Sequence, residues 1–157
     1  MPIKVLFICH GNICRSVCAQ YVFDMLVGED RLEYAYTCES AATSREEIGN
    51  PIYPPMRQTL MSHGVPIGDH RARQLRRSDY DEYDLIIGMD SENMYYIRNI
   101  IGEDPEGKVR TLMSYTDRPD ELIDDPWYTR DFETAYRQIR RGCEALLDHL
   151  KEEGYDA

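Results

Sequence analysis

The stretch that decides the fold lies near the N-terminus and reads Ile3-Lys4-Val5-Leu6-Phe7-Ile8-Cys9-His10-Gly11-Asn12-Ile13-Cys14-Arg15-Ser16. Its first six residues form a short apolar run with β-branched and aromatic side chains, which predicts a buried strand. Residues 16–27 carry apolar side chains at helical spacing, and Gly28 suits the end of that helix. A thiol therefore lies where a strand ends, and an arginine and a hydroxyl lie where a helix begins.

The alternation of strand and helix continues along the chain. Further strands are expected at residues 34–40, 84–90 and 108–113, and further helices at residues 54–63, 74–83, 91–102 and 132–150. This order favours one parallel sheet with helices on both faces and right-handed crossovers. Ser91 is expected to cap the helix that follows the third strand. Ligands of such folds bind beyond the carboxyl ends of the strands, so Asp90 and the loop after the first strand should share one rim.

Length and charge narrow the class of protein. A chain of 157 residues without a repeat or linker predicts a single domain spanning residues 1–157. A net charge of −11 repels nucleic acid and anionic lipid, so neither is an expected partner. We also expect no membrane association, because no apolar run is long enough to span a bilayer and the first residues do not resemble a signal peptide.

The cysteines predict reduced thiols. There are five of them, an odd number that cannot form a complete disulfide framework, and their spacing matches no zinc motif. We therefore expect a cytoplasmic protein with no metal and no cofactor. Cys18, Cys38 and Cys143 are expected to lie in the core.

The loop that follows the first strand has the composition of an oxyanion-binding loop. Successive backbone N–H groups from His10 to Arg15 can point inward as an anion nest, and the Arg15 fork can grip two oxygens. A helix N-terminus and an arginine both stabilise a thiolate, which favours Cys9 as a nucleophile. Gly11 and Asn12 tolerate left-handed backbone geometry. The bare Cys-x5-Arg spacing also occurs by chance, but the flanking strand, helix and Ser16 favour function.

A thiolate that attacks phosphorus displaces an oxygen that must be protonated, which calls for a general acid. Asp125 in Asp124-Asp125-Pro126-Trp127-Tyr128 is the candidate, with Pro126 stiffening the chain after it. Trp127 and Tyr128 would flank an aromatic leaving group. The alternative is an ordinary acidic turn followed by a core tryptophan.

Taken together, Cys9–Ser16 and Asp125–Tyr128 resemble the low-molecular-weight protein tyrosine phosphatase family. Ser40-Ala41-Ala42-Thr43 and His70-Arg71-Ala72-Arg73-Gln74 agree with the same family, so the resemblance covers essentially the whole chain. It implies an α/β fold with a doubly wound, four-stranded parallel sheet of order 2-1-3-4, helices on both faces and a phosphate-binding loop after strand 1. The implied substrates are phosphotyrosine-containing proteins or small aryl phosphates, with inorganic phosphate as an inhibitory product.

The resemblance also implies a role for each matching residue. Cys9 would form a cysteinyl-phosphate, Arg15 would bind the phosphate, and Asp125 would act as general acid and then general base. Cys14 would trap oxidised Cys9 as a reversible disulfide. The remaining implied residues fall into three sets. The phosphate-binding loop would consist of His10, Gly11, Asn12, Ile13, Cys14, Arg15 and Ser16. The network that supports the loop would consist of Ser16, Asn12, Ser40 and His70. The substrate cleft would be lined by Trp127, Tyr128, Asn50 and Tyr53.

Two positions depart from the family pattern. Val17 replaces the usual proline after the loop serine, and His10 stands where a small or apolar residue is common. A cation at position 10 would favour acidic or phosphorylated partners. The basic cluster Arg71, Arg73, Arg76 and Arg77 is either a solvated face or a source of local positive field.

Three other functions compete with tyrosine phosphatase. Arsenate reduction needs a downstream cysteine pair, and Cys38 and Cys143 are isolated in the sequence. A relative that hydrolyses phosphoarginine carries threonine where this chain has Ile13, whose apolar side chain suits a phosphotyrosine ring better. A module that only binds phosphate would not need Cys9, Arg15 and Asp125 together.

Overall fold

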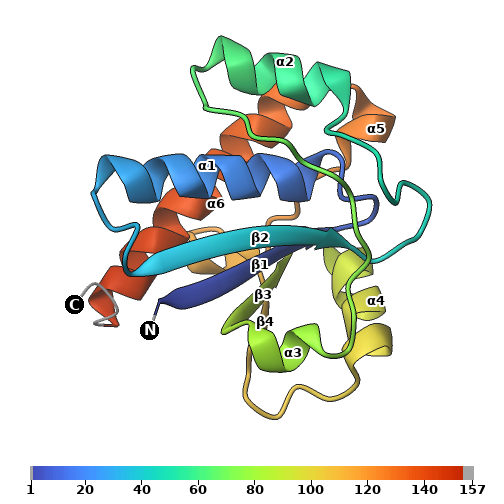
Figure 1. Ribbon diagram of the computed structural model, residues 1–157, viewed down its shortest axis with the longest axis vertical. Helices are drawn as coiled ribbons and strands as arrows, with labels where there is room; N and C mark the ends of the chain where they lie inside the picture. Colours follow the sequence, from blue (N-terminus) through green and yellow to red (C-terminus); the bar gives the residue numbers. More distant parts are fainter. Residues whose placement is uncertain (1, 154–157) are drawn as a thin grey trace.

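The apolar run at the N-terminus forms a central strand of a parallel sheet. The computed structural model describes residues 2–153, in which β1 (Ile3–Cys9) pairs with β2 (Tyr36–Ala42) on one side and with β3 (Leu85–Gly88) on the other (Figure 1). The fourth strand, β4 (Val109–Thr111), pairs with β3. The order β2-β1-β3-β4 confirms the expected fold class.

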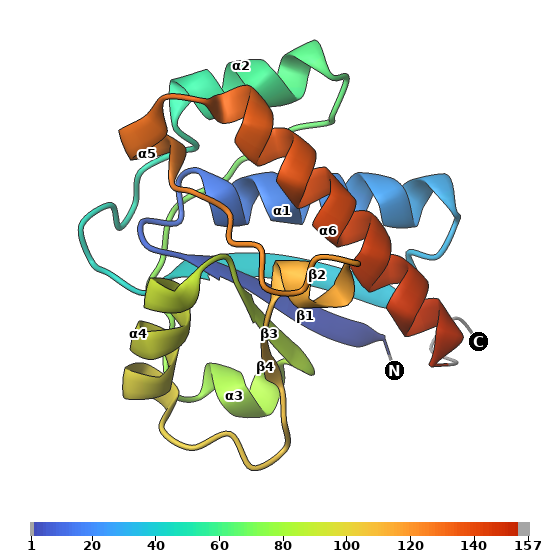
Figure 2. The same ribbon diagram turned by 180° about the vertical axis from the view of Figure 1, so that it is seen from behind.

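Helices cover both faces of this sheet (Figures 1 and 2). One face carries α1 (Arg15–Glu29) and α6 (Phe132–Glu152), which pack against each other, with α2 (Pro54–Ser62) against α6. The opposite face carries α3 (Asp79–Glu82) and α4 (Ser91–Ile101). The 3-10 helix η1 (Leu112–Tyr115) packs against α6. The one-turn helix α5 (Pro126–Thr129) lies near the first turn of α6 (Figure 2).

The side chains of β1 explain why both faces are covered. Val5 and Phe7 enter the larger core beneath α1 and α6, whereas Leu6 and Ile8 enter the smaller core beneath α3 and α4. All four are fully buried, as expected for a strand of a parallel sheet between two helical layers. Val17, the departure at the start of α1, is also fully buried in the larger core, so packing accounts for its apolar side chain.

Several expected boundaries were wrong. β2 begins and ends two residues later than predicted, because Ala41 and Ala42 still pair with β1. The helix expected at residues 74–83 is confined to α3, and the strand expected at 108–113 ends at Thr111, where η1 begins. Gly28 lies within α1, and the chain turns after it at Arg31, whose φ is 58°. The cap of α4 is Asp90 and not Ser91, because the Asp90 side chain accepts the N–H of Asn93.

The described residues hold neither a membrane-spanning helix nor a cluster of metal ligands. None of the helices within residues 2–153 combines the length and apolar character of a membrane-spanning helix. Within the same residues, no three His, Cys, Asp or Glu side chains gather as a metal site would require. All five cysteines are buried and unpaired.

Candidate active site

Cys9 lies at the carboxyl end of β1, where its sulfur faces the first turn of α1. Ser16 Oγ lies 3.2 Å from Cys9 Sγ, and the Ser16 backbone N–H donates to the sulfur at 3.4 Å. The Asn12 side-chain amide donates to Ser16 Oγ at 2.8 Å, which leaves the hydroxyl proton of Ser16 available to an ionised sulfur. These contacts stabilise negative charge on Cys9.

Asn12 gives the loop its turn. It is fully buried with a φ of 58°, the left-handed geometry expected at this position. The backbone N–H of Arg73 donates to Asn12 Oδ1 at 3.1 Å, and His70 Nε2 lies 2.6 Å from the Asn12 carbonyl oxygen, to which it donates. Burial lowers the pKa of His70 more than this hydrogen bond raises it, so the ring is neutral at neutral pH.

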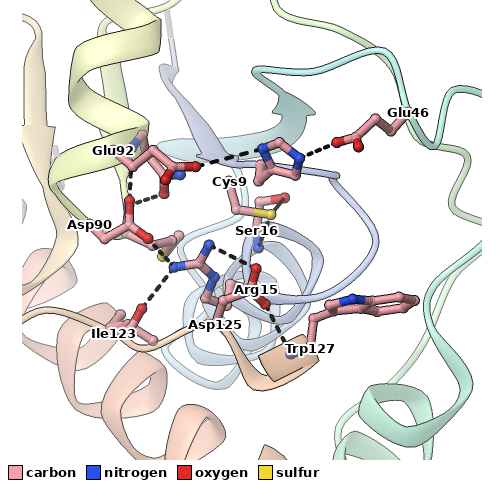
Figure 3. Close-up of polar contacts among 12 residues, drawn as sticks. Cys9, Arg15, Ser16, Glu46, Asp90, Glu92, Ile123, Asp125 and Trp127 are labelled. Carbon is pink, nitrogen blue, oxygen red and sulfur yellow. Dashed lines mark hydrogen bonds and ion pairs between the residues drawn. The ribbon is translucent and has the colours of Figure 1, made fainter. Parts of the chain in front are cut away.

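Arg15 is held in place by groups from two other segments, the residue Asp90 after β3 and the stretch before α5 (Figure 3). Its side chain is 2% exposed, and Nη1 donates to Asp90 Oδ2 at 2.6 Å and to the Ile123 carbonyl oxygen at 2.7 Å. Burial alone would lower the pKa of Arg15, but negative charge on Cys9, Asp90 and Asp125 outweighs burial and raises it. The guanidinium is therefore a permanent, oriented cation at the base of the site.

Asp125 faces the same guanidinium from the opposite end of the chain. Its Oδ2 lies 3.6 Å from Arg15 Nη2, and its Oδ1 accepts the Trp127 N–H at 3.0 Å as the cap of α5. Trp127 is 49% exposed and Tyr128 81% exposed, so neither is a core residue. The alternative of an acidic turn before a core tryptophan is therefore wrong.

These side chains open into one cleft. It is lined by Cys9, His10, Gly11, Ile13, Cys14, Arg15, Glu46, Glu47, Asp125, Trp127 and Tyr128. The floor carries a thiol, a cation and backbone N–H groups, and one wall is aromatic. Such a site combines a nucleophile, an oxyanion-binding loop and a carboxylate that can transfer a proton.

Comparison with known proteins decides the family. Residues 4–155 match the family of low molecular weight phosphotyrosine protein phosphatases. The chain belongs to this family. A low molecular weight phosphotyrosine protein phosphatase of Gallus gallus is 41% identical over 151 residues, which cover 92% of this chain and 94% of that protein.

Two solved structures of related chains show how closely the family fold is kept. The crystal structure of YfkJ from Bacillus subtilis superposes with a TM-score of 0.93 at 35% identity, covering 98% of this chain and 97% of the other. The crystal structure of DARP, a drosophila arginine phosphatase, superposes with a TM-score of 0.84 at 31% identity, covering 95% of this chain and 98% of the other. The same fold therefore occurs in proteins named as tyrosine phosphatases and in one named as an arginine phosphatase. The fold alone does not indicate the substrate, so the residues of the cleft have to be considered.

Three residues expected at this phosphatase-family site lie elsewhere. Ser40 donates to Gln20 Oε1 at 2.6 Å, so it joins β2 to α1 and does not support the Asn12 turn. Tyr53 does not line the cleft but packs against Trp127, which does, with a distance of 5.0 Å between the two ring centroids. Asn50 donates to Glu47 Oε2 at 3.4 Å, beside the cleft lining.

Three of the four arginines in the basic cluster, which was expected to be either a solvated face or a source of positive field, pair with acidic residues. Arg73 binds Asp79 at 3.0 Å, and Arg76 lies 3.8 Å from the same buried carboxylate. Arg71 pairs with Asp69 at 3.9 Å. None of these arginines lines the cleft, and Arg73 also contacts the Asn12 turn through its backbone N–H.

Sequence reasoning missed the acidic residues of the cleft. Glu46 and Glu47 line it, and the His10 ring contacts the Glu46 carboxylate while its Nδ1 lies 3.9 Å from Glu92. The adjacent glutamates in the loop after β2 were the only available signal. The path of that loop back over the site cannot be deduced from local sequence.

Proposed function

We propose that this protein is a tyrosine phosphatase that hydrolyses phosphotyrosine monoesters through a cysteinyl-phosphate. One observation carries the proposal: Cys9 and Arg15 at the two ends of the phosphate-binding loop line one cleft with Asp125, which comes from the distant segment before α5. The rest of the cleft suits an aryl phosphate, because the aromatic side chains of Trp127 and Tyr128 stand at the wall.

The first chemical step follows from this geometry. The substrate dianion binds to the loop N–H groups and to the Arg15 guanidinium, which also stabilise the equatorial oxygens of the transition state. The Cys9 thiolate attacks phosphorus in line, and the phosphorus–oxygen bond to the tyrosyl group breaks. Protonated Asp125 gives its proton to the departing oxygen.

The second step returns the enzyme to its starting state. Asp125, now a carboxylate, takes a proton from a water molecule that attacks the cysteinyl-phosphate. Cys9 leaves as a thiolate, which Ser16 stabilises through its hydroxyl and backbone N–H. Inorganic phosphate is released, and because it fits the same loop it is expected to inhibit.

The cleft favours phosphotyrosine over phosphoarginine. Ile13 lines the cleft with an apolar side chain, which contacts an aromatic ring well but cannot hydrogen-bond a guanidinium. Arsenate reduction is disfavoured because Cys38 and Cys143 point into other contacts: Cys38 Sγ lies 3.2 Å from Asp24 Oδ1, and Cys143 Sγ lies 3.6 Å from the Ala19 carbonyl oxygen.

We also propose that the enzyme is regulated by oxidation and acts in the cytoplasm. Cys14 lines the cleft beside Cys9, where it could form a disulfide with oxidised Cys9, and burial raises the pKa of its thiol, so Cys14 itself resists oxidation. We place residues 1–157 in one phosphatase domain in the cytoplasm, where the five unpaired thiols stay reduced. Nucleic acid and membranes are not proposed as partners, given the net charge of −11.

The decisive experiment measures turnover of an aryl phosphate and of a phosphotyrosyl peptide in the presence of a chelator. Wild-type protein should hydrolyse both, and Cys9→Ser should lose turnover while still binding phosphate. Full activity in Cys9→Ser would rule out the cysteinyl-phosphate. Faster hydrolysis of phosphoarginine than of phosphotyrosine would overturn the substrate assignment.

A further inference from the structure

One wall of the cleft is ionic. His10 follows Cys9 in the phosphate-binding loop, and its Nε2 contacts the carboxylate of Glu46 in the loop after β2. On its other side, His10 Nδ1 lies 3.9 Å from a carboxylate oxygen of Glu92 in the first turn of α4 (Figure 3). The imidazole therefore joins two segments that flank the nucleophile and fixes Glu46 at the mouth of the cleft.

The packing of the neighbouring residue Glu47 also helps to position Glu46. Glu47, its neighbour, packs on the phosphate-binding loop so closely that a methyl group on Gly11 would lie 3.3 Å from Glu47 Cγ. The packing of Glu47 on the loop and the contact of His10 with the Glu46 carboxylate both favour a position of Glu46 at the mouth of the cleft. Its side chain is nevertheless 67% exposed, so a bound peptide can reach it.

This wall is negative in either protonation state of the imidazole. A protonated His10 supplies one positive charge, while Glu46, Glu47 and Glu92 supply three carboxylates around it. The other cation of the cleft lining, Arg15, lies at the floor and is reserved for the phosphate. A residue that flanks a bound phosphotyrosine on the side of this wall therefore meets negative charge.

Two nearby arginines, Arg45 and Arg130, do not line the cleft and hydrogen-bond to other groups. Arg45, next to Glu46 in the chain, donates to Gln74 Oε1 at 3.1 Å. Arg130 donates to the Tyr53 hydroxyl at 3.0 Å. The expectation that His10 would attract acidic partners is thus opposed by the structure, because its charge is already matched by carboxylates.

We propose that Glu46, positioned by His10, is a specificity-determining residue that selects phosphotyrosine segments with lysine or arginine beside the phosphotyrosine. The inference rests on the proposed phosphotyrosine phosphatase activity and names the substrate class within it. A basic flanking side chain gains an exposed ion pair with Glu46, and an acidic one is repelled. Because the contact is exposed, its effect weakens as salt screens it.

The test compares two phosphotyrosyl peptides that differ only at the flanking positions, lysine in one and glutamate in the other. At low ionic strength, wild-type kcat/KM should favour the lysine peptide by about five- to tenfold, the combined effect of one attractive and one repulsive exposed contact. The preference should decrease at high salt. A small aryl phosphate, which lacks flanking residues, reports the chemistry alone.

Variants assign the preference to Glu46. The ratio of the two kcat/KM values should fall in Glu46→Gln, fall partly in His10→Ala, and reverse in Glu46→Lys. Glu33→Gln is the matched control. It removes the same charge just before β2 begins, at the amino end of the strands, whereas the cleft lies at their carboxyl end. Its ratio should equal that of the wild type.

The outcomes separate the inference from the proposed function. Equal kcat/KM for the two peptides in the wild type, with both hydrolysed, would overturn the specificity and leave the phosphatase activity standing. An unchanged ratio in Glu46→Lys would likewise remove Glu46 as its origin. No turnover of either peptide or of the aryl phosphate would overturn both.

Discussion

Asp90 binds Arg15 with one carboxylate oxygen and caps α4 with the other. Oδ2 accepts from Arg15 Nη1 at 2.6 Å, and Oδ1 accepts the N–H of Asn93 at 2.7 Å. Because the cap fixes the carboxylate to the start of a helix, the guanidinium is oriented by a rigid element. The third strand and α4 thus contribute to a site whose nucleophile follows the first strand.

Asp90→Asn should separate these two tasks. The variant keeps an oxygen for the cap but places an amide against Arg15, so we expect kcat/KM for an aryl phosphate to fall on the order of 100-fold through misplacement of the guanidinium. Stability measured by urea unfolding should fall by about 1–3 kcal/mol, the usual cost of a hydrogen bond to a charged group. Ser91→Ala, beside the cap but not part of it, should match the wild type. Wild-type activity in Asp90→Asn would refute the role in orienting Arg15.

Asp125→Asn should slow release of poor leaving groups far more than good ones. An amide cannot protonate the departing oxygen, so turnover of aryl phosphates with high-pKa phenols should fall about 100- to 10,000-fold, while nitrophenyl phosphates lose much less. Kinetics across a series of phenols measures this difference. Asp124→Asn changes the exposed neighbouring carboxylate and should have little effect. A uniform loss over the series would eliminate Asp125 as the acid.

The sequence predicted the parts of this protein that depend on local pattern or on the family motif. The loop of Cys9 was expected at the carboxyl rim because it follows the first strand, and Asn12 was expected in the left-handed turn that the structure shows. The predictions that were wrong or missing concern residues whose contacts come from distant parts of the chain. Ser40 looked like a loop support but packs against Gln20, and the acidic wall at Glu46 forms only because the loop after β2 folds back over the site.

Cap positions failed for a related reason. Ser91 is a good N-cap by residue type, yet Asp90 occupies the cap because its carboxylate can also reach Arg15. The contact between Asp90 and Arg15 cannot be predicted from residue propensities or from a pattern within one segment. Residues with two tasks are therefore those where local reasoning is least reliable.

Cys14→Ser should make oxidative inactivation irreversible. Peroxide converts the Cys9 thiolate to a sulfenic acid, and the Cys14 thiol then displaces water to form a disulfide that a reductant reopens. Without Cys14, Cys9 should proceed to sulfinic acid, so dithiothreitol should restore activity to the wild type but not to the variant. Cys18→Ala, which removes a thiol from the core, should recover like the wild type. Mass spectrometry that finds no Cys9–Cys14 link after oxidation would disprove this role of Cys14.

Asn12 combines backbone geometry with hydrogen bonding, and two substitutions distinguish these contributions. Asn12→Ala loses the side-chain bonds to Ser16 and Arg73 and strains the turn at its φ of 58°. Asn12→Gly loses the same bonds without the strain. We expect urea unfolding to show Ala less stable than Gly by about 1–2 kcal/mol, the cost of left-handed geometry for an L-residue. Equal losses would show that the hydrogen bonds alone hold the turn.

His70 predicts a pH dependence of stability. Burial lowers its pKa in the folded protein below the ordinary value of about 6.5, with Arg71 acting in the same direction and Asp69 against it. As the pH falls through that value, the unfolded chain binds a proton before the folded one does. The stabilisation is therefore present above the unfolded pKa and is lost as the pH decreases towards the folded pKa.

His70→Gln isolates this contribution, because its amide can still donate to the Asn12 carbonyl oxygen but does not titrate. Unfolding in urea from about pH 8 to pH 5 should show a constant gap in stability between the two proteins at the alkaline end, where His70 is neutral in both states. The wild type should then lose stability relative to the variant on acidification, while carboxylate titrations common to both proteins cancel in the difference. A gap that stays constant, or one that shifts in favour of the wild type at low pH, would show that His70 does not need to be neutral for the loop to fold.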